Sequence, residues 1–481
     1  RLGVADRVRA AGLHRDVPMD VYVALAMNEP PLLRLPYPSV AEAEARIAAC
    51  NDGTMPREPY QLISQYTLEP LLKSIAESLP SVDVRYGHEF LGFVQDASGA
   101  TATVRDLSGR TVDIAARFIV GCDGGSSAVR KQLGIQLRGE GNLLRLHQAL
   151  YYAPDLFDRL PIGRGPGKGR HYHIADDRAT FLIMQDSTKH WTLHAVVDRG
   201  EEMKAQFERT IGVPVPYDML FVGEWKQNLL LADRYGDGRV FLAGDAVHLV
   251  VPTGGLGMNT GVGDAIDLAW KLRGTLAGWG GPRLLESYEL ERRQIGERAV
   301  AASRYASFGR RAWRSTFRPN IRDHTPDGQA TRDNLARVAE VEQRKTNEMI
   351  GAELGYRYTG SPIVVDEPGG PEHLFREYVP TTWPGARLPH VWLEPDRSVH
   401  DVVGDGFTLL RLGRTRIDTD GLERAMRATG APFDVLTIDA PAPRDVYARD
   451  LVLVRPDLHV VWRGNTAPAD PAALASLATG H

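Results

Sequence analysis

A glycine-rich turn at residues 252–259 follows an acidic strand end and precedes a helical pattern. Gly244 and Asp245 close an apolar strand predicted over residues 240–243, and α/β folds bind ligands at the carboxyl ends of strands. Glycine lets a ligand approach the backbone closely, and the free N–H groups of a helix N-terminus attract negative charge. The pattern predicts a polyol bound to Asp245 beside a group that becomes anionic. A strand-to-helix crossover without ligand is the alternative, and the combined residues favour the ligand site.

A second acidic strand end occurs in FIVGCDGGSSAVR, residues 118–130. By itself, Asp123 is explained as the cap of the helix that follows it. Together with Asp245, it predicts two acidic strand ends that face one crevice. Arg130 could serve a phosphate or NADPH there, or lie on the surface.

The histidines offer no clear catalytic group. His248 lies beside the glycine turn, but we favour a structural role for it. His171 and His173 alternate along a predicted strand and therefore share one face. Because no third ligand accompanies them, we predict no metal site and interpret them as part of an ordinary sheet surface. The sequence identifies no catalytic residue.

Composition excludes several other classes of protein. The chain has 481 residues, of which 43% are hydrophobic and 25% charged, and its net charge is -4. These values are typical of globular domains and give no sign of a nucleic-acid or membrane partner. Only Cys50 and Cys122 are present, which excludes a disulfide framework and fits a reducing cytoplasm.

The elements that position these residues alternate between helix and strand. Strand patterns are expected at 82–85, in a hairpin turning at Ser108 and Gly109, and at 118–122, which is apolar on both faces. Residues 16–60 read as strands and loops, and residues 142–222 as an antiparallel sheet. Helical patterns cover five segments: residues 1–15, 61–79, 258–272, 283–317 and 328–354.

The C-terminal part resembles a separate small α/β domain. Its predicted strands cover residues 406–413 and 434–439, a helix covers 421–429, and a hairpin covers 450–464. Within 258–272, one helical face is predicted to be apolar, and it consists of Met258, Val262, Ala265, Ile266, Ala269 and Leu272.

Several of these motifs resemble one enzyme family. DGGSSAVR (123–130) is similar to the second FAD fingerprint of the flavoprotein aromatic hydroxylases, and GDAVHLVVPTGGLGMN (244–259) is similar to the third. This family is typified by p-hydroxybenzoate hydroxylase. YRYTGSPIV (356–364) and LVLVRPDLHVVWRG (451–464) resemble its phenol hydroxylase branch, whose tail is thioredoxin-like. The resemblance covers nearly the whole chain.

The resemblance implies roles for particular residues. Asp245 would bind the ribityl chain of FAD, and Asp123 would lie near the ribityl–pyrophosphate region. Gln65 would lie near the ribityl chain and ring, or would be an ordinary residue at a helix start. The other positions implied to hold or shape the flavin site are Pro252, Gly254, Gly255, Leu256, Gly257, Met258 and Asn259.

The first fingerprint of the family, GxGxxG, does not occur before the DG motif. We therefore expect that about 50 residues, one βαβ unit, precede Arg1 in the natural gene product. In the family that unit holds the ADP half of FAD. The chain as written is expected to bind FAD weakly or not at all.

The resulting fold class is α/β, α+β overall, with a doubly wound parallel FAD-binding sheet that lacks its N-terminal part. An antiparallel-sheet substrate domain and a C-terminal thioredoxin-like domain complete it. The predicted FAD-binding domain comprises 1–15, 61–141 and 223–300. The substrate domain comprises 16–60 and 142–222, a helical connection covers 301–376, and the thioredoxin-like domain covers 377–481.

The resemblance implies an FAD-dependent monooxygenase that consumes NADPH or NADH and O2. It would hydroxylate a phenolic or polycyclic aromatic substrate through a flavin C4a-hydroperoxide. One alternative is a flavin enzyme that performs Baeyer–Villiger or oxidative decarboxylation chemistry. The other is a non-catalytic, FAD-free binding or dimerisation protein. Residues 383–481 contain no cysteine, which excludes thiol redox chemistry there and leaves a homodimer interface open.

Overall fold

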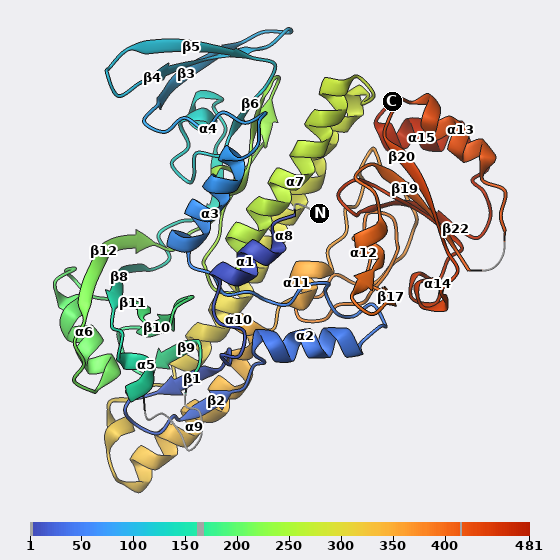
Figure 1. The fold of residues 1–481 in the computed structure, drawn as a ribbon. Coiled ribbons are helices and arrows are strands. Elements are labelled where there is room, and N and C mark those ends of the chain that lie inside the picture. Colours follow the sequence, from blue (N-terminus) through green and yellow to red (C-terminus); the bar gives the residue numbers. More distant parts are fainter. Residues whose placement is uncertain (1–2, 161–167, 414–415) are drawn as a thin grey trace.

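Two long helices form the centre of the molecule. The computed structural model describes residues 3–160, 168–413 and 416–481. Helices α7 (Leu256–Ala277) and α8 (Pro282–Arg314) run through it, with a large sheet, several small sheets and a C-terminal domain around them (Figure 1). Within the described ranges, no helix combines the length and the apolar character that a bilayer-spanning segment requires.

The large sheet has seven strands in the order β12-β8-β11-β10-β9-β1-β2. Only β1 and β9 pair in parallel. One face of the sheet packs Tyr151, Leu182 and Trp191 against helix α6 (Glu202–Ile211). Because side chains alternate along each strand, the other face packs against α8. The antiparallel sheet predicted for residues 142–222 is confirmed. Its strands are β1 (Val21–Ala24), β2 (Leu33–Leu35), β8 (Arg145–Tyr152), β9 (His171–Ile174), β10 (Phe181–Met184), β11 (His190–Ala195) and β12 (Asp218–Lys226).

Three small sheets lie beyond α7. The first pairs β6 (Ile119–Gly121) in parallel with β15 (Val240–Leu242) and adds β14 (Gly236–Asp237) in antiparallel orientation. The parallel pair brings the DG and GD motifs to one sheet edge, as predicted. The other two sheets consist of β3 (Glu89–Gln95), β4 (Ala100–Arg105) and β5 (Thr111–Ala116), and of β7 (Leu137–Glu140), β13 (Leu229–Ala232) and β16 (His248–Leu249).

In this region one predicted strand does not form, and the predicted burial of another strand is wrong. Residues 82–85 form no strand. They are irregular chain that leads into the β3–β4–β5 sheet. The strand predicted at 118–122 is not buried on both faces, since β6 is the edge strand of its sheet in the described chain and Val120 is 38% exposed. The hairpin that turns at Ser108 and Gly109 is confirmed, with Gly109 at a φ of 82°.

Several helices were not predicted from the sequence. Helix α6 (Glu202–Ile211) lies within the predicted sheet region 142–222, and α14 (Pro441–Tyr447) and α15 (Pro471–Thr479) lie in the C-terminal part. Residues 16–60 contain helix α2, where a capping box joins Ser39 and Glu42. The short prolyl segments around it suggested loops, although the Ser-x-x-Glu spacing is a helix-start signal. The other described helices are α1 (Ala5–Ala11), α2 (Val40–Ala49), α3 (Gln65–Glu77), α4 (Ala128–Gln132), α5 (Leu156–Arg159), α6 (Glu202–Ile211), α9 (Pro326–Glu342), α10 (Arg344–Asn347) and α11 (Ile350–Leu354), with short 3-10 turns η1 (Gly244–Ala246) and η2 (Pro319–Arg322).

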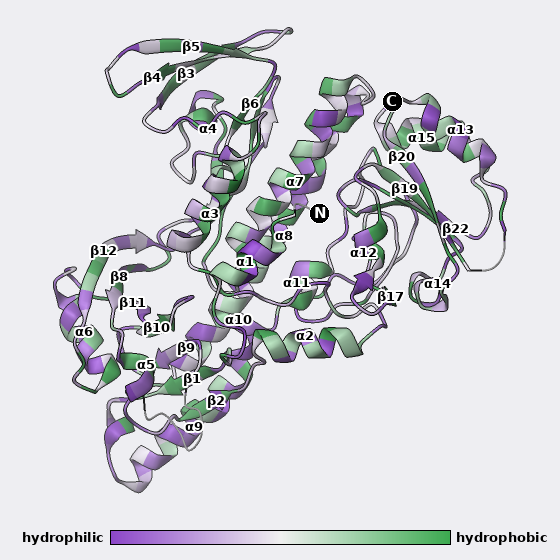
Figure 2. Cartoon of the chain, in the orientation of Figure 1, coloured by the Kyte–Doolittle hydropathy of each residue, from purple (hydrophilic) through white to green (hydrophobic). Residues whose placement is uncertain are grey.

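The C-terminal domain has a thioredoxin-like sheet with the order β20-β19-β21-β22. Strands β19 and β20 are parallel, and the β21–β22 hairpin is antiparallel, which confirms the predicted segments. Hydrophobic residues follow the strands of this sheet (Figure 2). Its elements are β17 (Trp392–Glu394), β18 (Arg397–Ser398), α12 (Val399–Val402), β19 (Phe407–Leu412), α13 (Asp420–Ala428), β20 (Phe433–Ile438), α14 (Pro441–Tyr447), β21 (Leu451–Val454), β22 (Val460–Gly464) and α15 (Pro471–Thr479).

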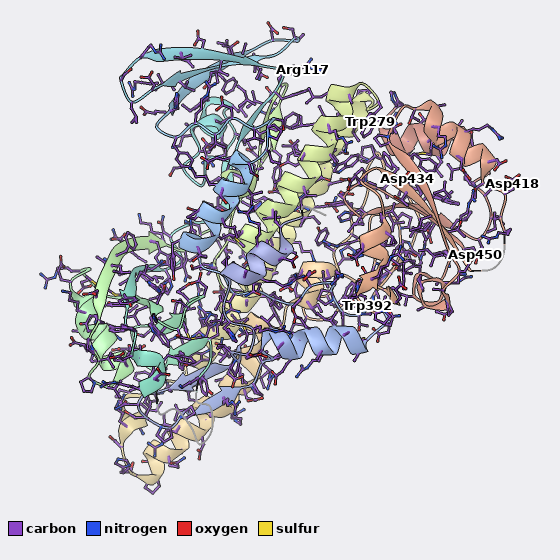
Figure 3. All side chains as sticks on the ribbon, viewed as in Figure 1. Arg117, Trp279, Trp392, Asp418, Asp434 and Asp450 are labelled. Carbon is purple, nitrogen blue, oxygen red and sulfur yellow. The ribbon has the colours of Figure 1, made fainter. Side chains whose placement is uncertain are left out.

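This domain shares its core with the rest of the chain. Trp270 and Trp279, from the end of α7, pack against Phe407 in the same apolar cluster as the sheet. On the other side, Trp392 donates its indole N–H to the carbonyl of Ile47 in α2, 2.9 Å away. Figure 3 labels Trp279 and Trp392 at these two junctions. The domain boundaries given above remain predictions.

Candidate active site

The GD motif forms a tight turn that packs directly on α7. Gly244 has a φ of 64°, which a side chain would strain, and begins the η1 turn after β15. A Cβ added at Gly261 of α7 would lie 3.1 Å from the Cα of Gly244, so only glycine allows this approach. The side chain of Asp245 is exposed at this turn. The predicted polyol ligand would meet a carboxylate on a rigidly supported loop.

The N-terminus of α7 has the features of an anion site. Gly255 is its N-cap at a φ of 69°, Gly254 has a φ of 97°, and no side chain caps the helix. Nothing lies within 4 Å of a Cβ built on Gly255, so the backbone there borders open space. The amide of Asn259 donates to the Gly255 carbonyl at 2.8 Å, and Met258 is 59% exposed. Free N–H groups and the helix dipole therefore point toward any ligand of this loop.

Two residues of the loop make contacts within the protein. The side chain of Leu256 is buried against Ala302 and Met349, so only its backbone is available to a ligand. Pro252 is exposed, and its carbonyl accepts the N–H of Gly255 at 3.0 Å, which closes the turn.

Asp123 caps helix α4. Capping is the role that the sequence favours when Asp123 is considered by itself. Its carboxylate accepts the N–H groups of Ala128 at 2.7 Å and Val129 at 3.1 Å and the hydroxyl of Ser127. Arg130 is neither a surface residue nor a free cation, since it is 5% exposed and donates to the carbonyls of Gly125 and Ala246. It ties the DG and GD loops together.

Gln65 lies at the first turn of α3, where its side chain is exposed and donates to Glu69. Among the described residues, no hydrogen bond joins it to the loop at 244–259. The adjacent Ser64 and Tyr66 both donate to Asp186, which follows β10 of the large sheet. Sequence analysis missed Asp186, the residue that fixes this helix start.

Behind the GD turn lies a buried ionic junction. Asp264 accepts the N–H of Gly244 at 3.0 Å, the ring nitrogen of His248 at 2.8 Å and Nε of Arg292 at 2.8 Å. Burial opposes ionisation of Asp264, but Arg292 and His248 outweigh it and hold its pKa below the usual value. His248 is fully buried in this junction, in agreement with the structural role favoured for it.

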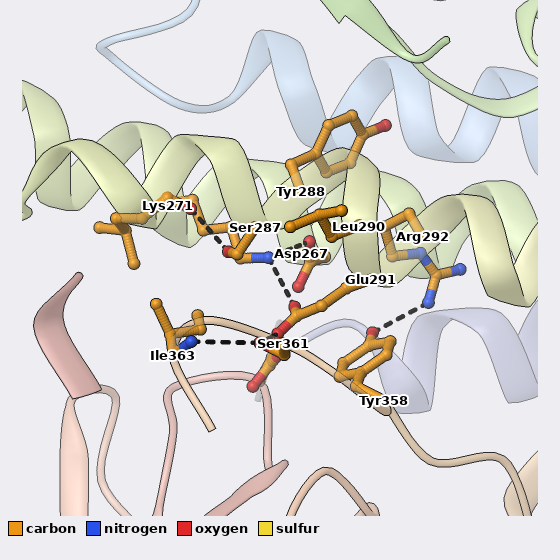
Figure 4. A network of polar contacts seen from close by, with 12 residues as sticks. Asp267, Lys271, Ser287, Tyr288, Leu290, Glu291, Arg292, Tyr358, Ser361 and Ile363 are labelled. Carbon is orange, nitrogen blue, oxygen red and sulfur yellow. Dashed lines mark hydrogen bonds and ion pairs between the residues drawn. The ribbon is translucent and has the colours of Figure 1, made fainter. Parts of the chain in front are cut away.

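A second buried network joins α7, α8 and the C-terminal domain (Figure 4). Lys271 donates to Asp267 at 2.7 Å and to Glu291 at 2.6 Å. Arg455, from the C-terminal domain, donates to Glu291 at 2.6 Å and also contacts Asp267 and Asp457. Three carboxylates face two permanent cations. Burial and the neighbouring carboxylate of Glu291 raise the pKa of Asp267 above its usual value, and Lys271 and Arg455 only partly oppose them.

These networks fix the orientation of α7. Met258, Val262 and Ile266 are exposed, whereas Asp264 and Lys271 are buried. The apolar side chains by themselves did not show which side of α7 packs against the rest of the protein and which side is exposed. The spacing of acidic and basic residues one and two turns apart was the available signal.

The sheet face toward α8 is polar and buried. His171 and His173 face the same side, with ring centroids 6.0 Å apart, and are 9% and 0% exposed, so the predicted ordinary surface is wrong. His194 stacks on Phe181 at 4.4 Å. Burial and Arg310 lower the pKa of His194 to about 3, and burial also holds the pKa values of the other two histidines well below the usual one. All three rings are neutral near pH 7.

The residues of this sheet face do not support a metal-binding site. Across residues 3–160, 168–413 and 416–481, no three His, Cys, Asp or Glu side chains are grouped to hold a metal ion.

Comparison with known proteins identifies the family. A model of the FAD binding domain matches residues 1–303, and a model of the C-terminal domain of aromatic-ring hydroxylases matches residues 381–479. The chain belongs to the FAD-dependent aromatic-ring hydroxylases. These aromatic-ring hydroxylases are monooxygenases, so the comparison favours an enzyme over the non-catalytic binding protein.

Relatives of this hydroxylase cover nearly its whole length. It is 31% identical to the FAD-dependent monooxygenase apdD of Emericella nidulans, over 98% of this chain and 80% of that protein. It is 32% identical to 4-methyl-5-nitrocatechol 5-monooxygenase of Burkholderia sp, over 90% of this chain and 80% of that protein. Among solved structures, the rebeccamycin biosynthetic enzyme RebC with reduced flavin is 32% identical, with a TM-score of 0.87 over 99% of this chain and 88% of RebC.

Proposed function

We propose that this hydroxylase holds FAD at the GD turn and the α7 N-terminus and hydroxylates a phenolic or polycyclic aromatic substrate. NADPH or NADH and O2 are the proposed co-substrates. One observation carries the proposal: the uncapped helix start at Gly255 adjoins a cavity that also borders the large sheet, through Thr253. A cofactor on the loop and a substrate under the sheet would therefore be neighbours.

The residues present fit a flavin. Gly244, Gly254 and Gly255 all have positive φ, and the backbone at Gly255 borders open space into which a flat ligand could pack. The exposed carboxylate of Asp245 suits ribityl hydroxyl groups, and the N–H groups at 257–259 suit the pyrimidine edge, which becomes anionic on reduction. When bound, FAD supplies the redox and oxygen chemistry of the reaction.

The chain's own groups have three proposed roles. The α7 start stabilises negative charge at the loop, and the Asp264 junction holds the loop in place through Gly244. The buried rings of Phe181 and His194 exclude water from the sheet side of the site. His194 stays neutral near pH 7, so it does not compete for an anionic substrate group.

The first experiment measures FAD affinity by flavin fluorescence in the wild type and in Asp245→Ala. Loss of hydrogen bonds to the ribityl chain is expected to weaken binding about tenfold or more. Asp237→Ala, an exposed carboxylate on β14, is the matched control. Equal affinity in both variants would contradict the proposed cofactor site.

The second experiment tests the reaction. We expect aromatic substrates to stimulate oxidation of NADPH or NADH, and the product to contain one additional ring hydroxyl. Mass spectrometry with labelled O2 shows whether one oxygen atom was added or a carboxyl group lost, and NMR distinguishes the ring hydroxyl from a ring-expanded product of the same mass. A ring-expanded or decarboxylated product would support the alternative flavin chemistries.

Two further proposals concern the whole protein. Cys50 and Cys122 are free thiols, which supports a reducing cytoplasmic location.

A homodimer through residues 383–481 is testable by sedimentation equilibrium, where a monomer mass would contradict it.

A further inference from the structure

A small cavity lies between the large sheet and α8. Its volume is about 70 Å³, and six of the residues that line it are Phe181, Gln227, Thr253, Ser307, Arg310 and Arg314. Among the described residues that line it, none is acidic. A cavity of ~150 Å³ holds one benzene ring, so this smaller space suits a substituent of the ring.

Arg310 differs from its neighbour one turn later. Arg314 donates to the carbonyls of Ile174 and Thr180 and lies 3.8 Å from Asp176. Arg310 makes no hydrogen bond or ion pair to any described residue, and its only ring contact is with Phe181, 4.9 Å from the guanidinium carbon. The cation is therefore held at the cavity without a counter-ion.

Other polar groups around it also lack acceptors. In the described chain, Nε of Arg310, Nε of Arg314 and the hydroxyl of Ser307 are buried without a hydrogen-bond partner. Ser307 is only 6% exposed, so bulk water does not readily replace the missing acceptor. Burial and the neighbouring Arg314 lower the pKa of Arg310 to about 9, so it remains charged at pH 7. Arg310 is half-buried with its Nε fully enclosed. A cation that shares its surroundings with unused donors and with no acceptor favours an anion.

We propose that Arg310 binds a carboxylate group of the aromatic substrate, with Ser307 as a second donor. A planar carboxylate matches the guanidinium fork, which donates two parallel N–H bonds. Thr253 lines the same cavity, so a carboxylate held there ties the substrate to the loop ahead of α7. This inference rests on the proposed hydroxylase function and narrows its substrate to aromatic acids.

The test is isothermal titration calorimetry of the full chain with 3-hydroxy-2-naphthoate and with its neutral amide, in the absence of NADPH. We expect the wild type to bind the acid about tenfold or more tightly than the amide. Arg310→Gln is expected to remove that preference without weakening amide binding, and Arg310→Lys to retain part of it. Arg283→Gln, an exposed arginine on the same helix, is the matched control.

Several results would overturn the inference. Equal binding of acid and amide by the wild type, including no binding of either, shows that no carboxylate site exists. Equal losses for both probes in Arg310→Gln show a packing role only. If Arg310→Gln weakens binding of 2-naphthol as much as that of the acid, the arginine serves the phenol. Thermal melts of both Arg310 variants verify that they fold.

The outcome is separable from that of the proposed function. Calorimetry without NADPH detects the carboxylate site even if no hydroxylation occurs. Conversely, a hydroxylase without this site still binds FAD and oxidises NADPH with a neutral phenol.

Discussion

At the scale of single residues, buried ionisable side chains are of two kinds. Those behind the GD turn are paired, as Asp264 is with Arg292, whereas Arg310 at the cavity has no described partner. Paired groups stabilise the fold, because loss of one partner leaves the other charge buried and uncompensated. An unpaired cation at a ligand site lowers stability and is retained for binding.

Arg310→Met should therefore stabilise the protein. Arg310 is half-buried and lacks a described counter-ion. Its replacement by an apolar side chain is expected to raise the free energy of unfolding by about 1–2 kcal/mol, reduced by the lost contact with Phe181. Urea unfolding of the variant and the wild type measures the difference. A destabilisation similar to that of a paired arginine would show that Arg310 has a partner in the native protein.

His194 should make stability depend on pH. Its folded pKa of about 3 lies below the unfolded value, so only the unfolded chain takes up this proton as pH falls below about 6.5. Stability should fall by about 1.4 kcal/mol per pH unit for this residue between 6.5 and 3.

His194→Asn tests this dependence by urea unfolding at pH 7, 6 and 5. We expect the free energy of unfolding to fall less steeply on acidification in the variant, by about 1.4 kcal/mol per pH unit, which is the contribution of one proton. The exposed His324→Asn is the control and should follow the wild type. Parallel curves for wild type and His194→Asn would show that the ring is protonated in the folded state.

At the scale of elements, α7 is held by its charged face. Asp264 connects the η1 turn, α7 and α8 at one point. Asp264→Ala leaves Arg292 buried without its carboxylate and is expected to cost about 3–5 kcal/mol of stability. Denaturant unfolding measures the loss, and Asp333→Ala, exposed on α9, should change stability by less than about 0.5 kcal/mol.

The same substitution should also loosen the GD turn. If the proposed cofactor site is correct, Asp264→Ala weakens FAD binding even at temperatures where the variant is fully folded. Unchanged FAD affinity in the folded variant would show that the turn keeps its shape without this carboxylate.

At the scale of the whole molecule, Arg455 anchors the C-terminal domain on α7 and α8. Among the described residues, Arg455→Met leaves Glu291 and Asp267 with Lys271 as their single basic partner. We expect a loss of about 3–5 kcal/mol and a lower melting temperature. Scanning calorimetry measures both, and Arg424→Met, exposed on α13, is the matched control.

Calorimetry also shows whether the domains unfold together. Because Trp270 and Trp279 share an apolar cluster with Phe407, we expect a single transition in the wild type. A separate, earlier transition of the C-terminal domain in Arg455→Met would locate the lost stability at this interface. An unchanged melting curve would contradict the anchoring role.

Local sequence patterns predicted much of this architecture. The segments of the C-terminal sheet, the hairpin at Gly109 and the strand before Gly244 all formed close to their expected bounds. Each depends on the periodicity of side chains within one segment and on nearby glycines, which are properties of neighbouring residues. The same holds for the DG and GD motifs, which carried the family resemblance.

Burial and pairing depended on the tertiary structure. The sequence could not show that Arg455 neutralises Glu291, that α7 buries its acidic face, or that Arg310 meets a cavity beside Phe181. These relations join residues far apart in the chain, and their energy depends on which groups lose water together. The sequence by itself thus determined the local elements and the cofactor motif, while only the tertiary structure decided which charged groups are paired and which are not.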